Sequence, residues 1–259
     1  MAGDEQVLIP DFDIQPIGKR KAIRQEIRTA LDSKAKPVGS LGDLENVAEK
    51  IGAIQESVSP RLFNPSVLLF AGDHGVTATG FFEDSGDETA TMVDQFLKDS
   101  APVNTLAEEF QMDVYLADAG VYKTFEGNER FIDVKIRPGT RNFLEEPAMT
   151  VSECRTAIDE GAGLARQLSI QSCNCILPGE MSANNTLSAA LIMHLITGIP
   201  LETCIGDHSD EELSHPEKAH KAISKVISDS SNYSDPLEIL RRFGGYEMAM
   251  LVGAYLYSA

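Results

Sequence analysis

The sequence has no tryptophan, few basic residues and no long apolar run. It holds 22 lysines and arginines against 40 aspartates and glutamates, which gives a formal net charge of −18. Such a charge repels phosphate backbones and anionic lipids, so we expect no binding to nucleic acid. Because the N-terminus begins acidic and no apolar stretch reaches the ~20 residues of a membrane span, we expect neither secretion nor membrane insertion, and a cytoplasmic protein.

Cysteine is also scarce. The four cysteines form no C-x-x-C pair and show no metal-finger spacing, and Cys173 and Cys175 fall at alternate positions of an apolar run. A chain of this length buries about three-quarters of its unfolded surface, so it needs no disulfide framework. We therefore predict that the cysteines are reduced core residues of a cytosolic protein.

Helical periodicity dominates the first 60 residues. The spacing predicts a helix over residues 17–31, where Ile23, Ile27 and Leu31 recur every four positions, and a second helix over residues 41–56. Three short apolar segments follow at residues 65–72, 114–120 and 173–180, each near a carboxylate beside a glycine and flanked by helical pattern.

Continuous apolar strands separated by helices are typical of an α/β fold. We expect a mostly parallel Rossmann-like sheet flanked by helices, with a small helical subdomain from the N-terminal segment. The predicted division is residues 1–60, packing on the core, and residues 61–259, the nucleotide-binding core of what is a single domain overall. Ligands of such sheets gather beyond the carboxyl ends of the strands, where Asp73, His74, Asp118 and Glu180 are expected to lie.

The first candidate site is the turn Gly72-Asp73-His74-Gly75. Its two glycines let the backbone approach a ligand, while Asp73 supplies an acceptor and His74 a titratable ring. A purely structural alternative, in which His74 caps the turn by bonding Asp73, has about equal weight.

The second candidate is the segment 178–186, interpreted as a strand-to-helix turn. A helix predicted from Ser188 to about Leu195 would point its free N–H groups at this loop and form an anion seat. Glu180 opposes an anion there, so we expect a sugar or nitrogen base as well. The alternative is a simple helix cap, because Asn184, Asn185 and Thr186 all cap well.

Five segments of the sequence carry recognisable motifs. They are K-P-V-G-S-L-G-D-L-E at 36–45, F-A-G-D-H-G-V at 70–76, G-T-R-N-F with P-A-M-T at 139–150, G-E-M with N-T at 179–186, and G-G-Y-E-M-A at 244–249. Together, and in this order, they resemble the signatures of the nicotinate-nucleotide:dimethylbenzimidazole phosphoribosyltransferase family, and we identify the chain as a divergent member on this basis.

The resemblance implies an enzyme of cobamide biosynthesis, a pentosyltransferase of the cytoplasm. In the family, nicotinate mononucleotide gives its ribose phosphate to the nitrogen of an aromatic base, with inversion at the anomeric carbon and release of nicotinate. The family needs no metal and no redox cofactor, and its members dimerise. The enzyme mainly positions two rings, holds the phosphate and removes a proton from the incoming base.

The resemblance covers about the first three-quarters of a typical member. The family's general base lies in a C-terminal S-A-E-P-G-H loop that has no counterpart here, so we expect this chain alone to lack it. Glu180 matches a second family carboxylate, which lines the base pocket and bonds the incoming ring. It either keeps that binding role or substitutes as the base, and burial would raise its pKa in the useful direction.

Two parts of the family's site are altered. In the base pocket, Phe82 replaces a serine, Asp84 replaces a stacking aromatic residue and Thr91 replaces a glutamine, which predicts a different acceptor or none. At the phosphate end, a G-x-G-T-G turn becomes residues 206–210, with Gly206 kept and two carboxylates introduced. Lys221 matches a lysine that neutralises phosphate, or is a solvated helix residue.

The resemblance thus implies Glu180 as the catalytic residue and a larger set of substrate-binding residues. Two other functions stay open: a catalytically degenerate partner subunit, pairing as a homodimer or with a related chain, and a nucleotide-binding protein without transferase activity. The substrate-binding residues implied are Gly72, Asp73, His74, Phe82, Thr91, Gly179, Met181, Asn185, Gly206 and Lys221.

Overall fold

The computed structural model describes residues 12, 14, 16, 20–80, 87–183, 185–206, 223, 224, 226, 227 and 234–259. Contacts divide the chain into two compact units, residues 12–63 and residues 64–258, and each is described by itself. Among the described residues, no helix is long and apolar enough to cross a membrane.

Residues 12–63 contain two packed helices, α1 (Lys21–Asp32) and α2 (Asp43–Ile54). Both predicted helices are confirmed, each a few residues shorter than expected. The buried Ile27 packs closely on α2, since a Cβ at Gly52 would lie 2.7 Å from Ile27 Cδ1. A small residue at Gly52 therefore lets the two helices approach.

Residues 64–258 contain a four-stranded sheet with the order β3-β2-β1-β4, in which every pair is parallel. The central strand β1 is almost wholly buried, as the continuous apolar run predicts. The parallel α/β architecture is confirmed. The strands are β1 (Ser66–Gly72), β2 (Asp113–Gly120), β3 (Phe131–Asp133) and β4 (Ile176–Met181).

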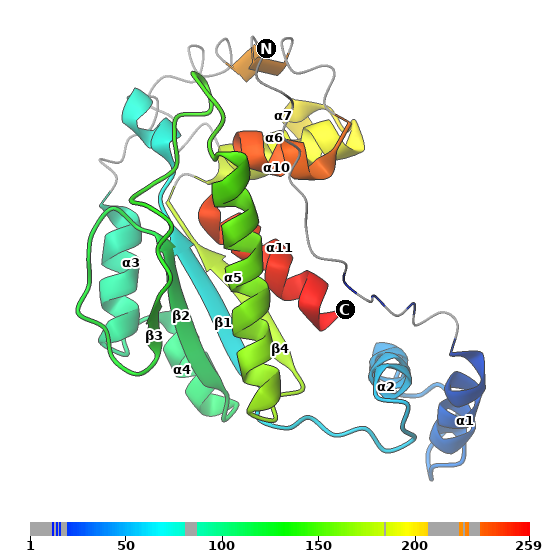
Figure 1. Ribbon diagram of the computed structural model, residues 1–259. Coiled ribbons are helices and arrows are strands. Elements are labelled where there is room, and N and C mark those ends of the chain that lie inside the picture. The colour runs from blue at the N-terminus through cyan, green and yellow to red at the C-terminus, as the bar shows by residue number, and fades with distance from the viewer. Residues whose placement is uncertain are drawn as a thin grey trace. The chain divides into compact units, whose positions relative to one another are not determined.

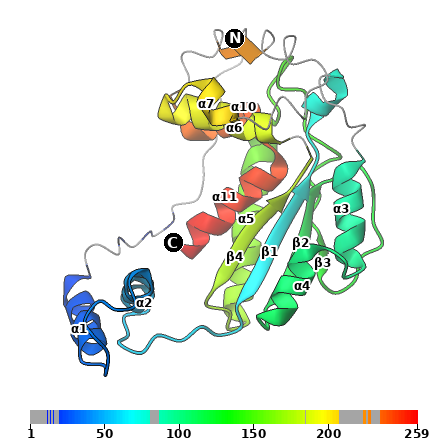
Figure 2. The same cartoon turned by 180° about the vertical axis from the view of Figure 1, so that it is seen from behind.

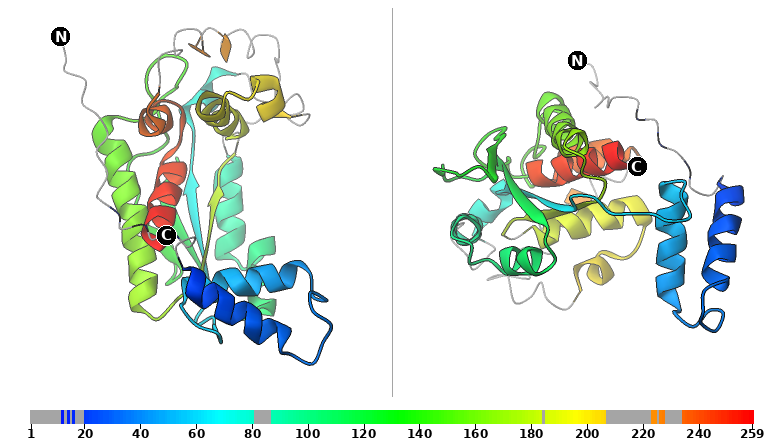
Figure 3. Two further views of the ribbon diagram at one scale, coloured as in Figure 1. Left: turned by 90° about the vertical axis from the view of Figure 1, so that its right-hand side faces the viewer. Right: turned by 90° about the horizontal axis from the view of Figure 1, so that it is seen from below.

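Helices cover both faces of the sheet (Figure 3). On one face lie α5 (Val151–Ile170), which starts with a capping box formed by Thr150 and Glu153, and α11 (Tyr246–Ser258). On the other face lie α3 (Glu88–Leu97) and α4 (Pro102–Glu109). A Cβ at Gly161 or Gly253 would collide with the backbone of the facing helix. These glycines therefore allow α5 and α11 to touch through their backbones.

Three further helices lie beyond the carboxyl ends of the strands (Figures 1 and 2). They are α6 (Thr186–Thr197), α7 (Leu201–Ile205) and α10 (Pro236–Phe243), while the short 3-10 helix η2 (Gly75–Thr79) follows β1. A second apolar cluster packs α6 and α10 together, with Phe143 meeting Phe243 edge to face. This cluster fixes α6 at the edge of the sheet where ligands are expected.

The prediction of a turn over residues 178–186 is wrong in its first half. Residues Pro178 to Met181 continue β4, and Glu180 and Met181 pair with Phe70 and Ala71 of β1. Pairing with the buried central strand extends β4 in spite of its Pro-Gly dipeptide, because a proline is tolerated on an edge strand. The turn is correspondingly short, and α6 begins at Thr186, two residues before the predicted start.

Candidate active site

The carboxyl ends of β1 and β4 lie side by side, and Asp73 and His74 follow β1 directly. From β1 the chain builds β2 and β3 on one side, whereas β4 lies on the other side. Such a reversal of strand order opens the crevice in which α/β proteins bind ligands. The sequence placed Asp73, His74 and Glu180 at this edge, and the structure brings them together.

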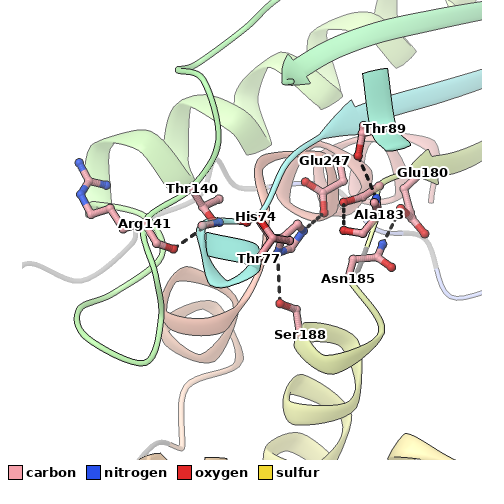
Figure 4. A network of polar contacts seen from close by, with 12 residues as sticks. His74, Thr77, Thr89, Thr140, Arg141, Glu180, Ala183, Asn185, Ser188 and Glu247 are labelled. Carbon is pink, nitrogen blue, oxygen red and sulfur yellow. Dashed lines mark hydrogen bonds and ion pairs between the residues drawn. The ribbon is translucent and has the colours of Figure 1, made fainter. Parts of the chain in front are cut away.

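His74 joins three elements through its ring (Figure 4). Its Nε2 lies 2.7 Å from Glu247 Oε1 in α11, and its Nδ1 lies 3.1 Å from Ser188 Oγ in α6. The three side chains are at most 1% exposed. Both ring nitrogens are thus occupied, and the alternative in which His74 caps its turn by bonding Asp73 is wrong.

Two glycines make room for the Glu247 carboxylate. A Cβ at Gly72 would lie 2.6 Å from Glu247 Oε2, and a Cβ at Gly245 would collide with both carboxylate oxygens and with His74 Nε2. Glu247 Oε2 is buried and has no hydrogen-bond partner in the part of the chain that is described. Gly72, predicted as a substrate-binding residue, therefore has a packing role in this structure.

The charge state of His74 follows from two opposing effects. Burial is the largest effect and disfavours the imidazolium form, but the charge and hydrogen bond of Glu247 and the charges of two further carboxylates together outweigh it, so the pKa of His74 is raised above its ordinary value. Glu180 and Asp73 act in the same direction as Glu247. At this edge, three carboxylates therefore favour the charged form of the buried His74 ring.

Asp73 ties together the loops that surround the edge. Its Oδ2 accepts a hydrogen bond of 2.7 Å from the Tyr122 N–H after β2, and its main-chain oxygen accepts one of 3.0 Å from the Thr140 N–H. Burial raises the pKa of Asp73, whereas the Tyr122 N–H and the Thr89 hydroxyl lower it. These contacts give Asp73 a structural role; its predicted contact with substrate stays a prediction.

Asp118, at the end of β2, is also occupied by protein groups. It accepts a hydrogen bond of 2.9 Å from the Val121 N–H and lies 3.0 Å from Lys135 Nζ. Its carboxylate is 2% exposed. The side chain therefore braces the turn after β2.

Glu180 differs from these buried carboxylates because it is exposed to solvent. Its Oε2 accepts a hydrogen bond of 2.6 Å from Asn185 Nδ2 (Figure 4). Partial burial and the negative charge of Glu247 raise the pKa of Glu180, against the effects of Asn185 and His74. A carboxylate with a raised pKa and an open face is suited to hydrogen-bond or deprotonate a ligand.

The start of α6 has no side-chain cap. Asn185 occupies the capping position, but its amide is turned to Glu180 instead of bonding the first turn of the helix. The helix-cap interpretation of Asn185 and Thr186 is therefore wrong, whereas Asn184 lies outside the described residues. The N–H groups of the first turn thus have no side-chain cap, as an anion seat requires.

The contacts of the remaining predicted site residues do not show whether they bind a substrate. Gly179 packs against Leu69, whose Cδ2 would lie 2.9 Å from an added Cβ, and the half-buried Met181 packs on the same core cluster. Thr91 is exposed on α3 and donates to the Asp87 main-chain oxygen at 3.0 Å. Gly206 ends α7 with a positive φ. Phe82 and Lys221 lie outside the described residues, as do Asp84 and residues 207–210.

Sequence reasoning missed three residues of this site: Ser188, Glu247 and Thr89. The Thr89 hydroxyl accepts a hydrogen bond of 2.9 Å from the Ala183 N–H and so joins α3 to the loop after β4. One signal was available, because Glu247 is the charged residue of the otherwise apolar helix start G-G-Y-E-M-A. Within the described ranges, no group of three or more His, Cys, Asp and Glu residues is arranged to hold a metal ion.

Comparisons with known proteins agree with this geometry. A protein family described as phosphoribosyltransferase matches residues 18–259. The nicotinate-nucleotide--dimethylbenzimidazole phosphoribosyltransferase of Dechloromonas aromatica (strain RCB) is 38% identical over 257 residues, which cover 98% of this chain and 71% of that protein. The protein of the same name from Aromatoleum aromaticum is 37% identical over 233 residues, which cover 90% of this chain and 68% of that protein.

Solved structures agree as well. CobT from Thermus thermophilus superposes with a TM-score of 0.82 at 29% identity, covering 91% of this chain and 71% of that chain. A second structure from the same organism, a nicotinate-nucleotide-dimethylbenzimidazole phosphoribosyltransferase, gives a TM-score of 0.79 at 29% identity, covering 91% of this chain and 70% of that chain. The parallel sheet, the residues at its carboxyl edge and these matches lead to one conclusion: the chain belongs to the nicotinate-nucleotide:dimethylbenzimidazole phosphoribosyltransferase family.

Proposed function

We propose that this protein transfers ribose phosphate from nicotinate mononucleotide to a nitrogen of an aromatic base. The bond between the anomeric carbon and the pyridinium nitrogen breaks, its electron pair stays with nicotinate, and the incoming nitrogen forms the new bond. The base must also lose the proton of its ring N–H, so that the product is neutral at the ring. The protein therefore needs a place for two rings, a seat for the phosphate and an acceptor for one proton.

The observation that carries this proposal is the exposed Glu180 carboxylate at the edge between β1 and β4. The other carboxylates there, Asp73 and Glu247, are buried and bonded to protein groups. Glu180 is open to solvent and is oriented by Asn185. We assign it to bind the N–H of the incoming base and to accept its proton, a role that its raised pKa supports.

The uncapped start of α6 supports an anion seat for the phosphate. The first-turn N–H groups, which have no side-chain cap, and the helix dipole favour negative charge at this point. In a chain with a formal net charge of −18, an anionic substrate requires such local hydrogen-bond donors.

Release of nicotinate tests this function directly. Purified protein is mixed with nicotinate mononucleotide and a panel of benzimidazoles and phenols, and nicotinate is measured by chromatography. We expect release that depends on at least one acceptor. No release by the folded protein, together with binding of nicotinate mononucleotide in calorimetry, would favour the alternative of a nucleotide-binding protein without transferase activity.

We also propose that the protein acts in the cytoplasm as a dimer, either with its own copy or with a related chain. The α1–α2 unit supports an interface because Leu44, Val47 and Ile54 of α2 are between 50% and 68% exposed. Sedimentation equilibrium, alone and after mixing with an intact relative, tests this proposal. A partner-subunit role would appear as association that changes the activity of the relative.

A further inference from the structure

The loop between β4 and α6 is anchored on both sides of Asn185 (Figure 4). Before Asn185, the Ala183 N–H donates to Thr89 Oγ1 at 2.9 Å. After it, Ser188 Oγ lies 3.1 Å from His74 Nδ1. These two contacts fix the backbone that carries the Asn185 amide.

Both anchors are shielded from water. Thr89 and Ser188 are 0% exposed, and His74, which holds Ser188, is 1% exposed and bound to Glu247 by its other nitrogen. Breaking a buried hydrogen bond leaves an unsatisfied polar group, which makes such contacts specific in geometry. The contacts therefore favour one position of the first turn of α6.

Glu180 depends on this position. Its side chain is long and exposed, and its carboxylate accepts a hydrogen bond of 2.6 Å from Asn185 Nδ2. An exposed glutamate without a fixed partner samples several rotamers. The Asn185 amide does not cap α6, and its hydrogen bond instead favours the observed rotamer of Glu180.

We propose that Ser188 and Thr89 are positioning residues for Glu180, with His74 and Glu247 supporting Ser188. They hold the loop so that Asn185 directs the Glu180 carboxylate to the incoming base. This inference rests on the proposed function of Glu180. Groups held within about 0.5 Å of the productive geometry depend on such a supporting shell.

Ser188→Ala tests the proposal, with Ser66→Ala as a matched control. Ser66 is also buried, and its hydroxyl donates to Asn64 O at 2.9 Å at the opposite edge of the sheet. Misplacing a reacting group slows catalysis strongly, so we expect Ser188→Ala to lower kcat about tenfold or more while KM for nicotinate mononucleotide stays within about twofold. Ser66→Ala should leave both constants within about twofold of the unaltered protein.

A second pair of variants tests the proposal independently, in case Ser188→Ala does not fold. Thr89→Val keeps the shape of the side chain but removes the hydroxyl, and Thr89→Ser restores it. We expect Thr89→Val to lower kcat selectively and Thr89→Ser to regain most of it. The proposal is overturned if Ser188→Ala and Thr89→Val behave like Ser66→Ala, or if a lower kcat is accompanied by a higher KM and a lower melting temperature.

An NMR measurement separates this inference from the proposed function. The Asn185 side-chain amide signals, assigned through Asn185→Ala, report the contact with Glu180 without any turnover. We expect Ser188→Ala to move these signals and Ser66→Ala to leave them in place. If the unaltered protein releases no nicotinate but Ser188→Ala moves the Asn185 signals, the proposed function is wrong and the positioning role of Ser188 is supported. If Ser188→Ala does not move the signals, the positioning role is wrong.

Discussion

Two buried glutamates, one in each unit of the molecule, are held in different ways. Glu49 of α2 is 4% exposed and is paired at 2.6 Å with both Arg24 and Arg28. Glu247 of α11 is 0% exposed and is paired at 2.7 Å with the single side chain of His74. The first has a permanent cation for each oxygen, whereas the second has one titratable partner and, among the described residues, one oxygen left without a hydrogen bond.

The difference separates a structural ion pair from one built into a site. The arginines of Glu49 are 39% and 60% exposed, so water reaches them easily if the carboxylate is removed. Water cannot reach His74 in the same way, because its ring is buried between α6 and α11 beneath the predicted substrate edge. Buried groups with incomplete pairing cluster at functional sites, where stability is exchanged for a defined geometry.

Removing Glu247 should have the largest effect on stability. In Glu247→Ala the buried His74 loses the carboxylate that favours its charge, and breaking a buried pair in this way costs about 3–5 kcal/mol. The free energy of unfolding, measured with urea at neutral pH, checks this. Glu160→Ala, on the exposed side of α5, serves as the control. A loss below about 1 kcal/mol, the range of surface pairs, would contradict the comparison.

The two pairs should also respond to pH in opposite directions. The pKa of His74 is raised in the folded protein, so its contribution is fully present below the ordinary value near 6.5 and is lost as the pH rises through the folded pKa. Glu49 has a lowered pKa, because the side-chain hydrogen bond from Arg24 favours the carboxylate, with Arg28 adding to it against burial. Its contribution is present above its ordinary value and is lost as the pH falls through the folded pKa.

Urea unfolding of the unaltered protein and His74→Gln, from about pH 6 to about pH 9, measures the first of these responses. We expect the difference in free energy of unfolding between the unaltered protein and His74→Gln to become smaller as the pH rises. The difference between the unaltered protein and Glu49→Gln should stay constant over the same range. A histidine contribution that grows with pH would show that the ring is buried in its neutral form.

Removing the charge of Glu49 should have the smallest effect. In Glu49→Gln the two arginines turn to solvent. Ion pairs whose cation is exposed contribute about 1 kcal/mol or less to the free energy of unfolding. Hydrogen exchange of the α1 and α2 amides is the appropriate measurement, because it reports on residues 12–63 separately from the sheet. A loss as large as that of Glu247→Ala would remove the distinction between the two glutamates.

Much of the fold could be predicted from local pattern. The runs at residues 65–72 and 114–120 are continuous and apolar, and they became β1 and β2 with nearly the expected bounds. For β4 the sequence patterns led to two conflicting predictions, a strand over residues 173–180 and a turn from Pro178. The structure has a strand over Ile176–Met181, because pairing with β1 keeps Pro178 and Gly179 extended. The packing of residues 1–60 on the core stays a prediction.

The candidate site was predicted in part. Strand-end patterns identified Asp73, His74 and Glu180, because carboxyl ends of parallel strands share an edge. The partners of His74 come from residues 188 and 247, far along the chain, and no local spacing connects them with residue 74. Asn185 was identified as a candidate. Its side chain bonds Glu180 and does not cap α6, and this could not be predicted because it depends on the position of Glu180 in β4.

Glu180→Gln provides the most direct test of the assignment of the active site. The variant and the control Glu160→Gln are compared in acceptor-dependent release of nicotinate from nicotinate mononucleotide. We expect Glu180→Gln to lower kcat/KM about 100-fold or more, as removal of a group that accepts a proton does, with the melting temperature unchanged. Equal rates for the two variants would contradict the placement of the reaction at the edge between β1 and β4.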